Sequence, residues 1–420
     1  MDVAEFRRAL HLGLGRATIY AREHDVHAFR EVILDACLHC YAYDVQLEGT
    51  RGSYMYELVG YLPDKDYYYD TVLQSLPDSV DDYDAVQRFH FAACMASDGH
   101  TEARQAMYDS YSPGPRRGES SAINFINLDG IQGFLFAAEK IGALLLAKPA
   151  DVDEGYLLSV SIEELGEESV WSALKEAAAT NPRIEAYRAA AQERHDRSNA
   201  HTNPRPALTS LTYEHLFEGV PHRKSYLLWK WGEQASDEEL ELAAKGLLAA
   251  ANSKDQLAHL WIFQKRRFPL DVNALLALVD IKEDRVCWAA INALGQISHP
   301  AVRALAFRLI DSRDTMRGGA IALIAQNFEP GDHSIVLQWF EEEQDNYTLH
   351  SFYMDLRDVW ERYPDKETEA SMLRVVYEKE PSSFCRETAV QRFIEIDALP
   401  DDVRAECAWD ANYDLRELVK

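Results

Sequence analysis

Four residues in the first quarter of the chain have the types and spacing of a metal site. Cys37 and Cys40 form a C-x-x-C pair, and His90 and Cys94 are four residues apart. Residues at these spacings share one face of a helix, and thiolate and imidazole groups are the usual ligands of tetrahedral zinc. Both pairs lie among Ala, Leu and Phe residues, where free cysteine is commonly a small buried hydrophobe. The pattern favours packing, with a metal or redox pair as the alternative, and we predict no metal or other cofactor.

A second cluster combines carboxylates with a guanidinium. Asp44, Glu48 and Arg51 surround a glycine-containing turn, and a carboxylate pair performs acid–base catalysis when burial separates its two pKa values. No nucleophile or phosphate-binding glycine loop stands beside them in the sequence. Gly13-Leu-Gly15 lies inside a helical pattern and follows no predicted strand, so it is not a dinucleotide motif. We interpret the cluster as a solvated or structural charge network and assign no catalytic residue.

Residues 183–230 have a net positive charge, unlike the chain as a whole, which is acidic. This stretch has eight Lys and Arg against five Asp and Glu, a local charge of +3, together with four histidines. Interleaved basic and aromatic side chains stack bases and neutralise phosphates, although a charge run is usually a solvated surface. An enzymatic or nucleic-acid-binding groove near residues 183–231 is therefore the alternative function. The candidate partner-binding residues are Arg194, Arg197, Arg223, Lys224, Tyr226, Trp229 and Trp231.

The chain as a whole is strongly acidic. Its 420 residues include 43 Lys and Arg against 70 Asp and Glu, a net charge of -27, while 47% of the residues are hydrophobic and 27% charged. These fractions of hydrophobic and charged residues are those of a folded protein, and they exclude disorder of the whole chain. The net charge repels the phosphate backbone and attracts basic surfaces. We therefore expect a protein partner with a basic surface, and nucleic acid is disfavoured.

The tyrosines are unevenly distributed. Nine of the 21 lie within residues 20–69. Tyrosine offers a large apolar area and one polar tip, so such enrichment marks either a packed core or a recognition surface. The sequence leaves both roles open.

The expected location is the cytoplasm. The first residues, MDVAEFRRALHLGLGR, carry charges throughout and lack the apolar core of a secretory signal. The longest apolar run, residues 131–147, is interrupted by Glu139 and Lys140 and predicts a buried helix rather than a membrane span. Six cysteines without framework spacing indicate a reducing compartment.

Three stretches of the second half align with one another. They start at Asp255, Asp284 and Asp314, at intervals of 29 and 30 residues. Each opens with Asp, continues through an apolar pattern of helical period, meets a proline and enters a second apolar pattern. Asp caps a helix start, while proline ends one helix and is tolerated at the start of the next. Each stretch predicts an αα-hairpin, and neighbouring hairpins must stack to bury their apolar stripes.

This pattern resembles the HEAT repeat family, closest to its short bacterial-type repeats of about 30 residues. Those repeats contain an aliphatic–Arg–x–x–Ala step, which is seen here at Val302-Arg303 with Ala306 and in part at Met316-Arg317. In that family Asp and Arg residues form ladders between repeats. The resemblance implies a structural ladder role for Asp284, Arg303, Asp314, Arg317, Arg386 and Arg416. It carries no information on function.

We therefore predict an all-α chain, an α-solenoid of stacked αα-hairpins with a divergent N-terminal half. Residues 1–111 form an N-terminal region of degenerate repeats, residues 112–235 a helical linker block with flexible loops, and residues 236–420 a HEAT-like repeat region with a C-terminal cap. The last helix is expected over residues 401–419. The expected function is that of a non-catalytic scaffold or adaptor, which binds a basic protein on the solenoid surface.

Overall fold

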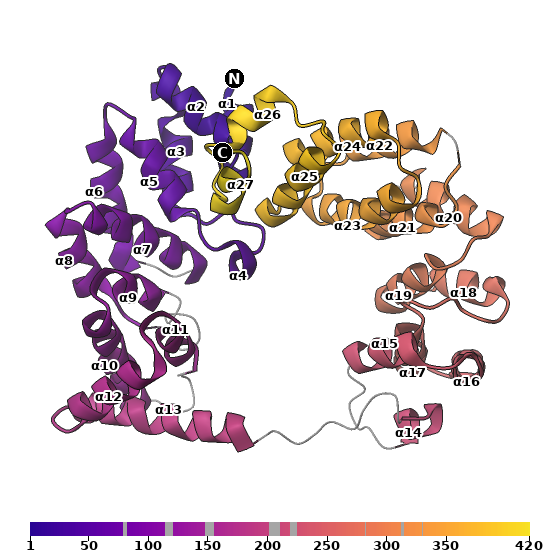
Figure 1. The fold of residues 1–420 in the computed structure, drawn as a ribbon, viewed down its shortest axis with the longest axis horizontal. Helices are drawn as coiled ribbons and strands as arrows, with labels where there is room; N and C mark the ends of the chain where they lie inside the picture. Colours follow the sequence, from indigo (N-terminus) through magenta and orange to yellow (C-terminus); the bar gives the residue numbers. More distant parts are fainter. Residues whose placement is uncertain are drawn as a thin grey trace. The chain divides into compact units, whose positions relative to one another are not determined.

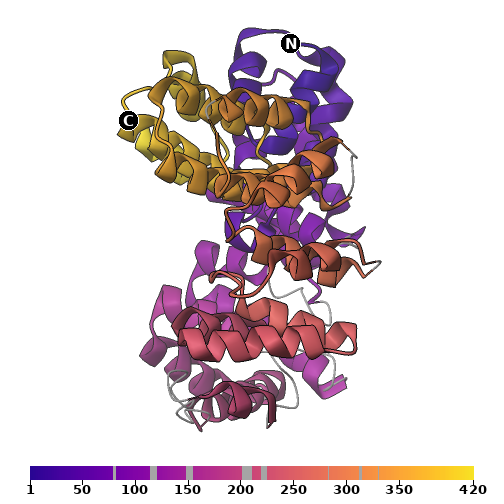
Figure 2. The same ribbon diagram turned by 90° about the vertical axis from the view of Figure 1, so that its right-hand side faces the viewer.

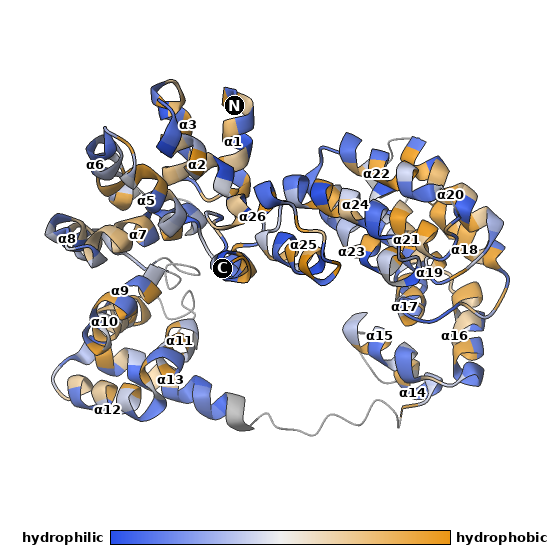
Figure 3. Cartoon of the chain, turned by 45° about the horizontal axis from the view of Figure 1, so that its top comes forward, coloured by the Kyte–Doolittle hydropathy of each residue, from blue (hydrophilic) through white to orange (hydrophobic). Residues whose placement is uncertain are grey.

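Helices make up all the regular structure that is seen. The computed structural model describes residues 1–78, 82–113, 121–147, 155–200, 211–218, 225–281, 283–311, 315–329 and 331–420. Over these ranges every regular element is a helix and no strand occurs (Figures 1 and 2). The prediction of an all-α chain is confirmed. Most helices combine polar and apolar residues (Figure 3), and none of those described is long and apolar enough to cross a membrane.

The chain divides into two compact units, defined by their internal contacts. Unit 1 comprises residues 1–203, 382–387 and 399–420, and unit 2 comprises residues 204–381 and 388–398. These limits differ from the predicted boundaries at residues 111 and 235. The segment expected to cap the repeat region, residues 399–420, is part of unit 1 together with the N-terminal helices. Residues 382–387, at the start of helix α25 (Ser383–Glu395), belong to the same unit.

Unit 1 is built on a row of alternate helices. Helices α1, α3, α5, α7 and α9 contact one another in chain order, and α10 packs against α9, α12 and α13. A buried cluster that includes Phe125, Phe134 and Tyr187 fills the space between α7 and α13. The helices of this unit are α1 (Val3–Leu12), α2 (Gly15–Glu23), α3 (Arg30–Leu38), α4 (Val45–Glu48), α5 (Gly52–Gly60), α6 (Lys65–Ser75), α7 (Asp82–Ser97), α8 (Thr101–Ser110), α9 (Ile123–Asp129), α10 (Ile131–Ala147), α11 (Gly155–Leu165), α12 (Glu167–Ala178), α13 (Pro182–Ala200), α26 (Asp401–Cys407) and α27 (Tyr413–Leu418), with 3-10 turns at His27–Phe29 and Leu76–Asp78.

Unit 2 has a similar row. Helices α15, α17, α19, α21 and α23 contact one another in chain order, while α18 packs against α19 and α20 against α21. Each of the three aligned sequence stretches contains two α-helices, but these two have few contacts with each other, so the predicted hairpins are wrong in their pairing. The consecutive helices that pack together are α16 with α17, α18 with α19 and α20 with α21. The helices are α14 (Tyr213–Glu218), α15 (Ser225–Gln234), α16 (Asp237–Ala249), α17 (Ser253–Ile262), α18 (Val272–Val279), α19 (Asp284–Leu294), α20 (Pro300–Asp311), the 3-10 helix Thr315–Gly319, α21 (Ala320–Ala325), α22 (Asp332–Glu342), α23 (Asn346–Arg362) and α24 (Lys366–Lys379).

Two glycines bring the C-terminal segment, residues 399–420, against the first helices of unit 1. Gly13 ends α1 in the left-handed region at φ 73°, and its carbonyl accepts from the backbone N–H of Ala411 at 2.8 Å. A Cβ added to Gly15 would lie 2.0 Å from the carbonyl oxygen of Glu406. The Gly13-Leu-Gly15 sequence therefore serves helix packing. Arg16 adds an ion pair, with Nε 2.6 Å from Oε1 of Glu406.

The predicted helix over residues 401–419 is in fact two helices, α26 and α27. The Asn412 side chain caps α27 by accepting from the backbone N–H groups of Asp414 and Leu415 at 2.9 and 3.4 Å. Oδ1 of Asp410 accepts from the backbone N–H of Asn412 at 2.9 Å. Such side chains compete with helical hydrogen bonds and interrupt a helix. The interruption directs the Asp410 carboxylate into the interior of unit 1.

Gly15→Ala and Gly60→Ala are expected to have opposite effects on stability. Alanine is favoured over glycine in a helix by about 1 kcal/mol, and a Cβ on Gly60 would meet nothing within 4 Å. A Cβ on Gly15 instead collides with backbone, and overpacking costs about 1–3 kcal/mol. Urea denaturation of both variants measures the difference. Equal free energies of unfolding would show that α2 and α26 do not approach this closely.

Candidate functional site

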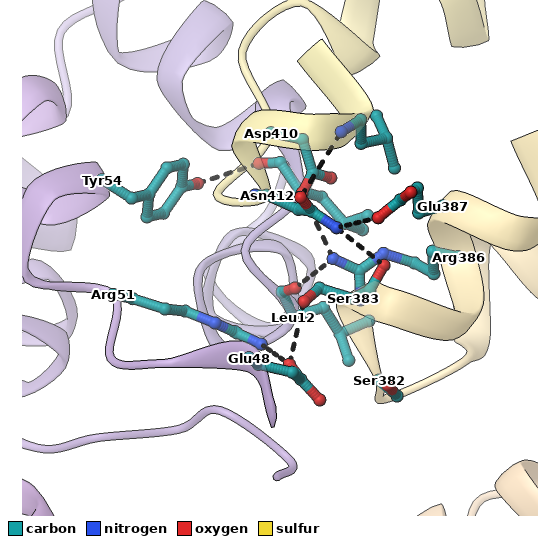
Figure 4. A network of polar contacts seen from close by, with 12 residues as sticks. Leu12, Glu48, Arg51, Tyr54, Ser382, Ser383, Arg386, Glu387, Asp410 and Asn412 are labelled. Atoms are coloured by element: carbon teal, nitrogen blue, oxygen red, sulfur yellow. Dashed lines mark hydrogen bonds and ion pairs between the residues drawn. The ribbon is translucent and has the colours of Figure 1, made fainter. Parts of the chain in front are cut away.

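A buried charge network joins the C-terminal segment to α1 and to the turn between α4 and α5 (Figure 4). The side chains of Arg386 and Asp410 are fully buried, with Nη2 of the arginine 3.5 Å from Oδ1 of the aspartate. The same nitrogen donates to the carbonyl of Leu12 at 2.6 Å. Nearby, Nη2 of Arg51 lies 3.7 Å from Oε2 of Glu48. Two arginines and two acids thus hold several separate segments of unit 1 together.

Burial governs the electrostatics of this network. It raises the pKa of the Asp410 carboxyl, an effect that the charge of Arg386 opposes. Burial also lowers the pKa of Arg51, and the charge of Arg386 lowers it further. Asp44 acts locally, since its side chain caps α4 by accepting from the next backbone N–H groups at 3.0 and 3.3 Å. We assign these residues a structural role.

A pocket of about 880 Å³ adjoins the network. Its size falls within the range of ligand sites, roughly 300–1,000 Å³. Glu48 belongs to both the network and the pocket wall, and Glu387 and Asp414 are the other lining carboxylates. Among the described residues that line the pocket there is no lysine or arginine. The pocket therefore presents negative charge without a cationic side chain in its wall.

The polar side chains of the wall are held by neighbouring groups. The Glu48 side chain is only 2% exposed and its Oε2 accepts from the hydroxyl of Ser383 at 3.0 Å. Oε2 of Glu387 accepts from the Asn412 amide at 3.0 Å. His90 Nδ1 lies 2.9 Å from the hydroxyl oxygen of Thr50. Burial lowers the pKa of His90, so the imidazole is neutral at pH 7 and does not offset the carboxylates.

Apolar side chains surround this acidic wall. Leu47 is 75% exposed, Phe384 58%, Tyr413 56% and Tyr156 47%, and all four line the pocket. Large apolar side chains that gather at one exposed place are typical of interaction sites. The sequence pointed to Glu48 but missed the C-terminal contributors, because they lay in an expected continuous helix. The Asp-Ala-Asn sequence at residues 410–412 is the signal for the interruption that brings them here.

The cysteine and histidine candidates do not assemble into a metal site. Of the described residues Cys37, Cys40, His90 and Cys94, no three bring ligand atoms within 4.8 Å of one another. Burial raises the pKa of the Cys37 and Cys40 thiols and that of Cys94 to about 11. Metal binding and nucleophilic attack both use the thiolate. We therefore assign these thiols a role in packing.

The candidates from the basic stretch are distributed over both units. Trp231 is buried and donates its indole N–H to the Leu211 carbonyl at 2.7 Å, so it contributes to packing. Arg197 is paired with Glu193 at 3.4 Å. Neither unit by itself contains the whole set. Of the seven residues, Arg194 and Arg197 lie on α13 of unit 1, Tyr226, Trp229 and Trp231 lie on α15 of unit 2, and Arg223 and Lys224 fall outside the described residues.

The arginines proposed for ladders all pair with acids. Arg303 binds Asp332, 29 residues further on, through Nη1 and Nη2 at 2.5 and 2.8 Å. Arg317 pairs with Glu343 at 2.9 Å, and Arg416 with Glu57 at 2.8 Å. Arg386 pairs with Asp410 as described above. Of the predicted aspartates, Asp284 is the first residue of α19 and Asp314 lies outside the described residues.

No protein-family model matches the chain, and neither the curated proteins nor the solved structures contain a significant match to it. The resemblance to HEAT-like repeats stays a prediction. The pocket is therefore interpreted from its own chemistry.

Proposed function

We propose that the chain is a non-catalytic adaptor, a HEAT-like α-solenoid, that binds a basic segment of a partner protein in the pocket of unit 1. The two rows of alternate helices, α1 to α9 and α15 to α23, support the solenoid, since stacked hairpins place every second helix side by side. The six free cysteines suit a reducing compartment, and we place the protein in the cytoplasm.

The composition of the pocket wall carries the proposal. Glu387 and Asp414 line a cavity in whose described lining no lysine or arginine stands, while the third lining carboxylate, Glu48, is buried and paired with Arg51. The chain as a whole has a net charge of -27. A cationic side chain that enters this pocket gains both the local and the long-range attraction. The aromatic rings of Phe384 and Tyr413 add cation–π contacts and apolar area. The same field repels a polyanion.

The same wall gives less support to catalysis than to binding. Glu48 and Glu387 are engaged by Ser383 and Asn412. Cys94 lies beside this wall, and burial raises the pKa of its thiol to about 11. A nucleophile needs a nearby base or a lowered pKa, and the arrangement here that comes nearest to this is the Thr50 hydroxyl, 2.9 Å from Nδ1 of His90. The pocket is therefore suited to holding a ligand.

Removing charge from the pocket is expected to weaken the binding of a basic peptide. The test variant is Glu387→Gln with Asp414→Asn, and the probe is a short fluorescent peptide that contains arginine and leucine. Exposed ion pairs contribute about 0.2–1 kcal/mol each, so loss of two of them should lower the affinity roughly two- to thirtyfold. Fluorescence anisotropy measures this, and binding should weaken further as salt is raised.

The matched control is Glu102→Gln with Asp66→Asn. Both are exposed carboxylates in the first turn of their helices, as Asp414 is, and neither lines the pocket. The control should bind the peptide as the wild type does, and duplex DNA should not compete. An equal loss in both variants, or equally tight binding of an acidic peptide, would contradict the proposed function.

A further inference from the structure

The pocket continues into a second one of about 670 Å³ within unit 1. The second pocket lies along α5 and α7 and is lined by their side chains together with those of α6 and α9. Shared lining residues place the two pockets side by side, and we call the pair the groove. Both are lined by Ser53, His90, Asn124, Asn127 and Tyr413.

The two ends of this groove differ in charge. In the second pocket Glu57 is paired with Arg416 at 2.8 Å, and Asp98 accepts from the hydroxyl of Tyr56 at 2.6 Å. Lys65 also lines this end. Arg416 and Lys65 thus offset the acids at this end, whereas the described lining of the first pocket contains no lysine or arginine. The second pocket does not attract a cation.

The second end is suited to an uncharged, apolar side chain. Its wall includes the aromatic rings of Tyr56, Tyr61 and Tyr69 together with Ala93 and Leu128. Aromatic and aliphatic walls with a few polar groups are the usual lining of sites that bury an apolar group. The tyrosine-rich stretch of the sequence thus contributes both to the core, through Tyr69, and to this exposed wall, through Tyr61.

We propose that the groove recognises a bipartite peptide segment, with an arginine in the first pocket and an aromatic or branched aliphatic side chain in the second. This inference rests on the proposed function and specifies its partner. Arginine is favoured over lysine because a guanidinium is weakly hydrated and stacks on aromatic faces, which Phe384 and Tyr413 expose at the first pocket. Unit 1 already uses such stacking, with Arg22 4.1 Å from the ring centre of Trp409.

Gly60 allows the second pocket to be filled without disturbing the fold. It is the last residue of α5 and lines the second pocket but not the first. A Cβ at this position would meet nothing within 4 Å. Gly60→Trp is therefore expected to place its indole in the pocket, and Gly60→Ala is the matched control that leaves the pocket open.

The experiment compares peptides and variants by fluorescence anisotropy. The probes are an arginine–leucine peptide, the same peptide with citrulline or lysine for arginine, and the same peptide with serine for leucine. The wild type should bind the arginine–leucine peptide at least about fivefold more tightly than each of the others, as for the loss of one interface anchor. Gly60→Trp should reduce that affinity to the level of the serine peptide. Gly60→Ala should leave it unchanged, and circular dichroism checks that both variants remain helical.

The outcomes separate this inference from the proposed function. Suppose that Gly60→Trp leaves the affinity unchanged while Glu387→Gln with Asp414→Asn lowers it. The second pocket then takes no part in binding, so the bipartite inference is overturned and the proposed function is not. If the citrulline peptide binds as well as the arginine peptide, both proposals fail. If lysine substitutes fully for arginine, the preference for a guanidinium is overturned.

Discussion

Arg386→Ala is expected to lower the free energy of unfolding by about 3–5 kcal/mol, the usual cost of removing one partner of a buried ion pair. Arg386 and Asp410 are both fully buried. Loss of the guanidinium removes the largest of the positive charges that compensate the Asp410 carboxylate, and it leaves the Leu12 carbonyl without this donor. The C-terminal segment should then detach from the N-terminal helices. Chemical denaturation measures the loss, and the fluorescence of Trp409, which Arg22 covers in unit 1, reports the detachment.

Two further variants identify the cause of this loss. Arg404→Ala removes an exposed arginine from the same segment and should change stability by no more than about 0.5 kcal/mol. Arg386→Met combined with Asp410→Leu replaces both charges by apolar groups and should recover most of the stability. If Arg404→Ala costs as much as Arg386→Ala, the buried pair is not what holds the segment.

The effect of Arg386→Ala should also depend on pH. Burial raises the pKa of Asp410 above its ordinary value, so the folded state binds a proton at this carboxyl more tightly than the unfolded chain does. Stability contributed by such a group increases as the pH falls through the folded pKa. Removal of Arg386 strengthens this dependence. The loss of unfolding free energy in Arg386→Ala should therefore be smaller in mildly acid buffer than at neutral pH. If this loss does not change with pH, it is due to packing alone.

Leu294→Ala is expected to produce the second large loss, about 2–5 kcal/mol for a buried leucine replaced by alanine. Leu294 is completely buried at the end of α19, on the same stripe as Ala290. This helix packs against α17, α18 and α21, so a cavity there loosens several contacts at once. Thermal denaturation followed by circular dichroism measures the effect.

Glu342→Ala is the control for this change. Glu342 is exposed at the end of α22, and its substitution should leave the melting temperature nearly unchanged, as surface substitutions usually do. Equal shifts from the two variants would mean that the apolar stripe of α19 does not face its neighbours.

The sequence by itself determined the helices of the repeats but not which of them pack together, since α18 packs on α19 and α20 on α21 across the predicted hairpin boundaries. Apolar spacing located α19 and α20, because one buried face per helix imposes the helical period on the sequence. Asp284 and Pro300 are the first residues of these two helices, since an acid in the first turn suits the helix dipole and proline is tolerated there. The net charge is the basis of the predicted cationic partner, because the long-range field is a sum over residues that does not depend on their arrangement in detail.

The tertiary structure alone decided the pocket and its supporting network. Glu48 and Ser383 are separated by 335 residues, and nothing in the local sequence pairs them. The interruption at residues 408–412 has a local signal in the Asp-Ala-Asn sequence, but only the tertiary structure shows that it buries Asp410 against Arg386 in the interior of unit 1. A buried charge is tolerated only where a partner from elsewhere in the chain compensates it, and such a partner is fixed by packing rather than by neighbouring residues.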